Sequence, residues 1–220
     1  TMKARRWDVV ALGGLGLAVA VTAAVYERLP DPVATHFDLR GNPDGWMPRP
    51  WAAWGMPAFA LVLWAVVRFA ARVLPSIDGK KASEGTMALM GALTAIFMAA
   101  VHVLILYVAL VPGAGIDRPL FLAMGALWVG IGLVLPRVRR NPVVGIRTPW
   151  TLTSDENWAR SQRVGGYAMV IGGAAGALAA LVGGASRGAL AMACFLGSAL
   201  VPVVYSVVLA RRQDDASRER

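Results

Sequence analysis

The chain has 220 residues, of which 57% are hydrophobic and only 16% are charged. Charged residues make up about a quarter of an average soluble domain, so this composition excludes an ordinary soluble protein. The net charge of +9 would suit a nucleic-acid-binding protein, but the distribution of the basic residues accounts for it differently. With Cys194 as the single cysteine, an intrachain disulfide is excluded.

Six long apolar segments predict an all-α integral membrane protein, a bundle of six transmembrane helices. At about 1.5 Å per residue, each segment is long enough to cross a hydrocarbon core of about 30 Å. The basic start resembles a signal peptide, but its apolar run is too long for one, so we interpret it as a retained first helix. The predicted helices cover about 9–26, 51–74, 86–111, 119–136, 165–184 and 188–209.

The lysines and arginines gather in alternate connecting segments. If the first residues are cytoplasmic, 16 of the 22 basic residues lie in cytoplasmic segments and five in outer segments, while Arg68 lies within the second helix. Positive residues are retained on the cytoplasmic side of bacterial membranes. We therefore expect both termini and the 137–166 loop to be cytoplasmic, with no direct nucleic-acid partner.

Small residues at every fourth position predict close helix packing in the fifth helix. The stripe consists of Gly172, Gly176, Ala180 and Gly184. We interpret it as an intramolecular packing surface first and as a dimerisation surface second. In the sixth helix, Pro202 removes one backbone hydrogen bond and should bend the helix near Ser198.

Two ionisable residues fall within predicted helices. His102 lies near the middle of the third helix, where a polar side chain is a candidate functional site. An interhelical hydrogen bond from a neutral imidazole is the interpretation that we favour. Arg68 lies near the inner end of the second helix, and we expect its long side chain to extend to the membrane interface.

The outer segment between the first two helices is polar and rich in turn-forming residues. Asn42 to Gly45 suits a type I turn, and the alternation before it favours a short strand. We expect a small, partly extended extracytoplasmic cap, with Trp46 near the membrane interface. His36, Asp38 and Asp44 are weak candidates for metal ligands, because no diagnostic ligand spacing accompanies them. Bonding to the loop itself is the favoured interpretation, and no cofactor is predicted.

The inner segment contains a helix-start signal. Thr153 followed by Glu156 fits a capping box, so a helix should begin near Ser154 and lie along the inner membrane surface before the fifth membrane helix. Arg147 and Arg163 would suit lipid phosphates or a partner's carboxylates. The interpretation that we favour is that they are topology determinants that pair with Asp155 and Glu156.

These two segments carry a family resemblance. LPDPVATHFDLRGNPDGWMPR, from Leu29, resembles a small domain of unknown function found near the start of bacterial membrane proteins. NPVVGIRTPWTLTSDENW, from Asn141, resembles the signature of the SdpI family of bacterial membrane immunity proteins. The matching outer residues are His36, Phe37, Gly41, Pro43, Asp44, Gly45 and Trp46, and the matching inner residues are Gly145, Arg147, Thr148, Pro149, Trp150, Thr151, Leu152, Asn157 and Trp158.

The resemblance implies a bacterial plasma-membrane receptor that protects against an exported toxin peptide and holds a cytoplasmic repressor at the membrane. It implies no catalytic residues, so we expect no enzyme. The residues expected to bind ligand or partner are His36, Asp38, Asp44, Trp46, Arg147, Trp150, Asn157 and Trp158. Residues 1–74, with an outer-loop domain at about 27–50, would form one region, and residues 75–220 the SdpI-like region.

Two other classes of function stay open. A membrane enzyme or small transporter would use His102 or the outer His/Asp group, although a complete catalytic set cannot be assembled from these residues. A structural scaffold would bind another membrane protein through the glycine stripe, but this hypothesis assigns no purpose to the two polar segments.

Overall fold

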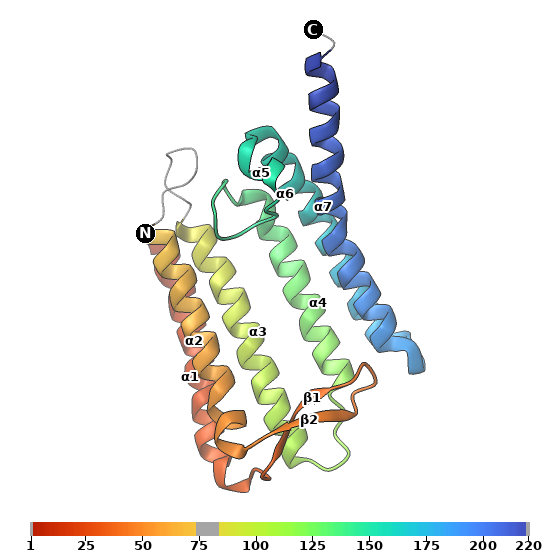
Figure 1. Cartoon of the computed structure of the whole chain (residues 1–220). Helices are drawn as coiled ribbons and strands as arrows, with labels where there is room; N and C mark the ends of the chain where they lie inside the picture. The colour runs from red at the N-terminus through yellow and green to blue at the C-terminus, as the bar shows by residue number, and fades with distance from the viewer. Residues whose placement is uncertain (1, 74–83, 219–220) are drawn as a thin grey trace.

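The computed structural model describes residues 2–73 and 84–218 (Figure 1). The domain boundary predicted at 74/75, together with Lys80 and Lys81, lies outside this part. The six long helices are α1 (Met2–Val25), α2 (Arg49–Val73), α3 (Glu84–Leu110), α4 (Asp117–Val134), α6 (Asp155–Val182) and α7 (Arg187–Arg218). Shorter elements are β1 (Val33–Phe37), β2 (Pro43–Met47), α5 (Pro149–Thr153) and the 3-10 turns η1 (Tyr26–Arg28), η2 (Leu135–Arg137) and η3 (Gly184–Ser186).

Each of the six long helices contains a segment that is apolar enough and long enough to span a membrane. The predicted class, a six-helix integral membrane bundle, is confirmed. Residues on the outside of the bundle are apolar, including Leu17, Phe69 and Leu200, which are 61–66% exposed. Such a surface suits contact with lipid rather than with water.

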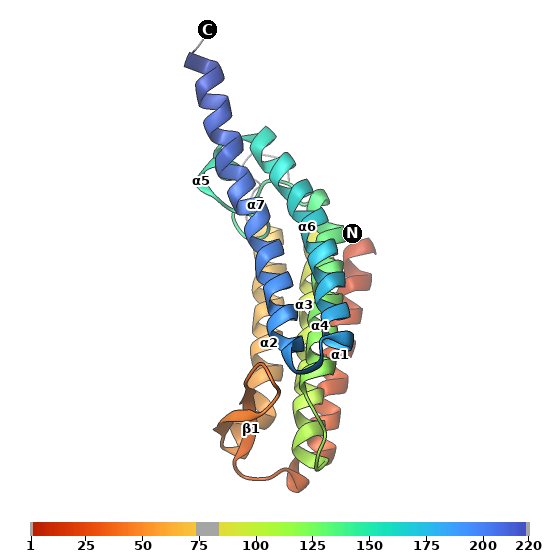
Figure 2. The same ribbon diagram turned by 90° about the vertical axis from the view of Figure 1, so that its right-hand side faces the viewer.

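The helices form two groups of three. In one group α3 packs against both α1 and α2, and in the other α6 packs against both α4 and α7. The contact between α3 and α4 joins the groups, which lie side by side in Figure 1. Figure 2, turned by a quarter, shows the hairpin β1–β2 at one end of the bundle and α5 near the other.

Glycines on two sides of α6 let three helix backbones approach closely. On one side, a side chain at Gly172 or Gly176 would overlap Ser198 or Phe195 of α7. On the other side, a Cβ at Gly166 would lie 2.7 Å from the Gly132 carbonyl oxygen of α4. The predicted stripe therefore packs within the chain, except at Gly184, which lies beyond the end of α6 and where an added Cβ would meet nothing within 4 Å.

Helices α1 and α3 share a seam of small residues that includes Ala18 and Ala95, each at most 2% exposed. One turn further along both helices, His102 Nε2 lies 2.8 Å from Thr22 Oγ1, and both residues are fully buried. Thr22 also donates its hydroxyl proton to the Ala18 carbonyl, which leaves the imidazole as the donor to Thr22. The interhelical hydrogen bond predicted for His102 is confirmed.

Arg68 has a partner that the sequence analysis did not anticipate. Its side chain is 5% exposed and forms a two-point ion pair with Asp8 of α1. Nε lies 2.6 Å from Asp8 Oδ1 and Nη2 lies 3.0 Å from Oδ2, a geometry that suits the planar guanidinium fork. The two residues lie 60 positions apart, and no local pattern pairs them.

The N-cap residue of α6 lies one position later than predicted. Ser154, not Thr153, caps α6 by accepting a hydrogen bond from the Asn157 N–H. The capping box belongs instead to α5, where Thr148 and Thr151 bond reciprocally. The surface helix expected before the fifth membrane helix is not separate, because α6 runs without a break from Asp155 to Val182.

Helix α7 is longer than predicted and contains Pro202 in its middle. Figure 1 shows that the axis of α7 changes direction along its length. Proline removes the N–H that would bond to the Ser198 carbonyl, which explains such a bend. A Cβ on Gly165 of α6 would lie 3.1 Å from the Pro202 ring, so the proline lies directly against α6.

Gly172→Ala should destabilise the bundle, because the new methyl group overlaps Ser198 and lies 2.8 Å from the Cys194 carbonyl oxygen. Overpacking of this kind costs about 1–3 kcal/mol. Thermal denaturation in detergent micelles would show a lower melting temperature. Gly197→Ala is the matched control, because nothing lies within 4 Å of its Cβ position, and equal melting temperatures for the two variants would contradict the prediction.

Asp8→Asn should destabilise the protein by leaving the buried Arg68 charge without its partner. Breaking a fully buried pair costs about 3–5 kcal/mol, and the cost here should be at the lower end because the Asp8 side chain is 18% exposed. Denaturant unfolding in micelles would measure the loss. Glu156→Gln, which breaks the half-exposed Glu156–Arg160 pair, should change stability by at most about 0.5 kcal/mol.

Candidate functional site

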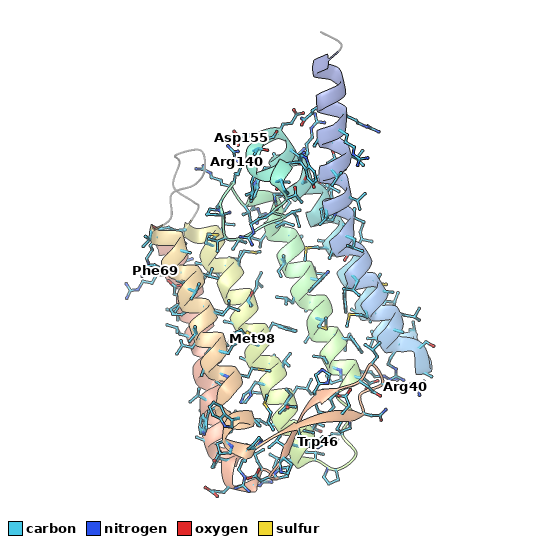
Figure 3. All side chains as sticks on the ribbon, in the orientation of Figure 1. Arg40, Trp46, Phe69, Met98, Arg140 and Asp155 are labelled. Atoms are coloured by element: carbon cyan, nitrogen blue, oxygen red, sulfur yellow. The ribbon has the colours of Figure 1, made fainter. Side chains whose placement is uncertain are left out.

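The polar residues form two segments at opposite ends of the bundle. We name them after the sides on which the sequence analysis expects them. The outer hairpin comprises residues 29–48 and contains β1 and β2, and the inner loop comprises residues 138–154 and contains α5. Figure 3 labels Trp46 and Arg40 on the hairpin, and Arg140 and Asp155 at the other end. The bundle separates the two segments, so any signal between them must pass through helices.

The turn of the outer hairpin lies at residues 38–42, and the turn predicted at Asn42–Gly45 was wrong because those residues largely form β2. Asp38 builds the turn by accepting hydrogen bonds from the N–H groups of Arg40 and Asn42 and from the Asn42 side chain. Gly41 supplies the left-handed backbone conformation that the turn requires, with φ of 82°. These bonds, first that of the Asn42 side chain, hold the pKa of the Asp38 carboxyl below its usual value.

His36 and Asp44 face each other across the hairpin. His36 Nδ1 lies 2.6 Å from Asp44 Oδ1, and both side chains are exposed to solvent. Asp38 does not join them, since its oxygens bond to the turn. Within residues 2–73 and 84–218 no group of three metal-ligating side chains comes together, so the three weak metal candidates do not form a ligand set there.

Aromatic residues continue from the hairpin into α2. Trp46 is 57% exposed on β2, and Trp51, in the first turn of α2, is 71% exposed. Trp54 stacks on Tyr26, with ring centroids 6.0 Å apart, and Arg49 lies over the same tyrosine ring. Of the four predicted outer site residues, His36, Asp44 and Trp46 thus present side chains to solvent, while Asp38 shapes the turn.

The tip of the outer hairpin touches the second group of helices. The Leu39 carbonyl oxygen lies so close to Gly188, in the first turn of α7, that any side chain at position 188 would overlap it. Gly41 lies against Asp117 in the first turn of α4, and Asp117 in turn forms a 3.1 Å ion pair with Arg187. The hairpin therefore contacts the ends of both α4 and α7.

At the other end, Asn141 holds the first part of the inner loop in shape. It is 3% exposed, and its side-chain oxygen accepts from the N–H groups of Val143 and Val144. Its NH2 group donates to the carbonyls of Arg139 and Val144. All of these bonds stay within the loop, so Asn141 organises the backbone and is not free to bind a ligand.

Gln162 of α6 binds the next part of the loop. Its amide accepts from the Ile146 N–H and donates to the Ile146 carbonyl, at 2.9 and 3.0 Å. Gly145, with φ of 124°, passes so close to Trp158 that a Cβ would lie 2.9 Å from its ring. Trp158 donates its indole N–H to the Val138 carbonyl. Loop and helix are therefore held together by several hydrogen bonds.

The loop is also joined to α7 through one residue, Ser206. Its hydroxyl lies 3.1 Å from Thr148 Oγ1, and its carbonyl accepts a 2.9 Å hydrogen bond from the Asn157 side chain. Ser161 donates to Asn157 and completes the cluster. All four residues are at most 8% exposed, so α5, α6 and α7 meet in a buried polar contact.

The four predicted inner site residues are of two kinds. Arg147 and Trp150 are exposed, whereas Asn157 and Trp158 are buried and bonded to α7 and the loop. Arg147 donates to the Pro142 carbonyl. Sequence reasoning missed Asn141, Gln162 and Ser206, and the only signal available was that Gln162 and Ser206 are polar residues at the edges of apolar segments.

Comparison with protein-family models gives two matches. The model of the domain of unknown function DUF1648 matches residues 13–61, which run from α1 through the outer hairpin into α2. The model of the SdpI/YfhL protein family matches residues 137–206, from the end of η2 through the inner loop and α6 to Ser206 in α7. Neither a curated protein nor a solved structure matches the chain.

The two matches contain the outer and the inner motif in the expected order, and the six apolar helices agree with a membrane family. The chain is a multi-pass membrane protein with an N-terminal segment that matches the DUF1648 model and a C-terminal segment that matches the SdpI/YfhL family model.

Proposed function

We propose that the protein is a non-enzymatic immunity and signalling receptor of the bacterial plasma membrane. Its outer hairpin binds an exported toxin peptide, and its inner loop binds a cytoplasmic repressor. The observation that carries this proposal is the position of α7, which the hairpin tip touches at Gly188 and the inner loop contacts at Ser206. The SdpI/YfhL match supports the immunity class of function.

The proposed orientation places both termini and the inner loop in the cytoplasm. It rests on the 16 basic residues in the segments of that side against five on the other. The hairpin then faces the outside, where a secreted peptide arrives. The exposed edge of the hairpin offers the His36–Asp44 pair and Trp46, a combination of charge and aromatic surface that suits a peptide.

The proposed mechanism is a shift between two arrangements of α7. A peptide bound on the hairpin would favour one position of the Leu39–Gly188 contact over another. Movement of α7 would alter the Ser206 contacts to Thr148 and Asn157, and with them the exposed face of α5 that carries Trp150. A ligand shifts such an equilibrium only through different affinity for the two states.

Trp46→Ala should remove most of the protection that the protein gives to a toxin-sensitive bacterial strain, because it deletes the largest exposed apolar side chain of the hairpin. Truncation of an aromatic binding residue costs about 2 kcal/mol or more, which corresponds to at least about thirtyfold weaker binding. Survival at increasing toxin concentration, with membrane levels checked by immunoblot, measures the effect. The control is Trp51→Ala, which removes a more exposed tryptophan outside the hairpin and should keep full protection. Equal survival of cells with the two variants would refute the hairpin as the binding surface.

Ser206→Ala tests the connection between the two segments. The variant loses the hydroxyl contact with Thr148 but keeps the hairpin, so cells should still bind labelled peptide while the downstream response weakens. A reporter for the repressor's target promoter provides the second readout. Ser186→Ala, in the exposed turn before α7, is the control. An unchanged reporter response in Ser206→Ala would show that the signal does not pass through this contact.

A further inference from the structure

A basic pocket is formed partly by the inner loop, and none of its lining residues belongs to α7. It has a volume of about 310 Å³ and lies between the end of α4 and the first turns of α6. Its lining residues are Pro136, Arg137, Val138, Arg139, Arg140, Asp155, Trp158 and Ala159. We propose that this pocket binds the phosphate headgroup of an anionic phospholipid.

The charge of the pocket favours an anion. Three arginines stand against one carboxylate, and Asp155 pairs with only one of them, at 2.8 Å from Arg140 Nε. Arg140 also donates to the Leu152 carbonyl and is therefore committed to the protein. Within the described part of the chain, neither Arg137 nor Arg139 forms an ion pair, and both are exposed. Two guanidinium groups are thus available for phosphate oxygens.

The level of the pocket along the bundle, at the end of a membrane-spanning segment, favours a lipid over a free anion. The membrane-spanning segment that contains α4 ends at Arg137, so Arg137 and Arg139 stand at the level of the headgroups. Pro136, which lines the pocket, packs its ring against Gly166 of α6, so the pocket adjoins apolar atoms. Figure 3 shows Arg140 and Asp155 together at this end of the bundle, beyond the end of α4.

The remaining walls match the boundary between headgroup and acyl chains. Pro136, Val138 and Ala159 present apolar atoms, while the buried Trp158 is fixed by its hydrogen bond to Val138. A glycerophospholipid has this same division, with a charged phosphate above an apolar glycerol and chain region. The structure thus supplies paired cations and an adjoining apolar wall, which neither an isolated phosphate nor a zwitterionic lipid would use fully.

Native mass spectrometry of the full chain in micelles of a nonionic detergent tests the proposal. Phosphatidylglycerol and phosphatidylcholine with the same acyl chains are titrated separately, and inorganic phosphate forms a third series. The first phosphatidylglycerol should bind the native protein at least about tenfold more tightly than the first phosphatidylcholine, since charge-assisted hydrogen bonds contribute on this scale. Inorganic phosphate should show no comparable binding.

Two variants remove the site in different ways. Arg137→Gln/Arg139→Gln deletes the free cations, and Ala159→Glu keeps them but adds a carboxylate to the pocket; both should lose the preference for phosphatidylglycerol. Arg211→Gln/Arg212→Gln makes the same change of net charge on exposed residues of α7 and should keep it. The proposal is overturned if both pocket variants, eluting as folded protein in size-exclusion chromatography, retain the native preference. It is equally overturned if phosphatidylcholine binds as tightly, or if inorganic phosphate does, which would assign the pocket to a free anion.

Discussion

Helix α6 approaches α4 and α7 so closely that backbone atoms, rather than side chains, form much of the contact. Between apolar helices in a lipid environment there is little hydrophobic gain in association, so the packing of short-range contacts has to hold the helices together. Glycines on two sides of α6 make this possible, with Gly172 and Gly176 toward α7 and Gly166 toward α4. The inner loop depends on this packing, because Gln162 and Trp158 bond to it from the same helix, from which Asn157 bonds to Ser206 of α7.

The membrane helices and the glycine stripe were predictable because their causes are local. Length and apolar composition decide whether a segment can span a membrane, and a small residue at every fourth position necessarily lies on one side of a helix. The hydrogen-bond partner of His102 and the cap at Ser154 required three-dimensional information. Thr153 and Ser154 are both acceptable N-caps, but Thr153 is the last residue of α5, so Ser154 takes the N-cap position of α6.

The candidate site was less predictable than the fold. His36, Asp38 and Asp44 are close in sequence and chemically similar in their potential to bind a ligand, yet Asp38 serves the turn and only the other two form a pair. The error in placing the turn has the same origin, since Pro43 and Gly45 suit a turn locally but pair with β1 in the hairpin. Arg68 shows most clearly what cannot be predicted from the sequence alone. Whether it reaches lipid headgroups or Asp8 depends on how α1 and α2 pack.

The close contact between Leu39 and Gly188 has a consequence for protein engineering. Leu39 belongs to the region matched by the DUF1648 model, and Gly188 belongs to the region matched by the SdpI/YfhL model. The two regions are therefore not interchangeable modules joined by a neutral linker. A chimaera that took its first half from one homologue and its second half from another would need a residue without a side chain at the start of α7, or a hairpin of different length.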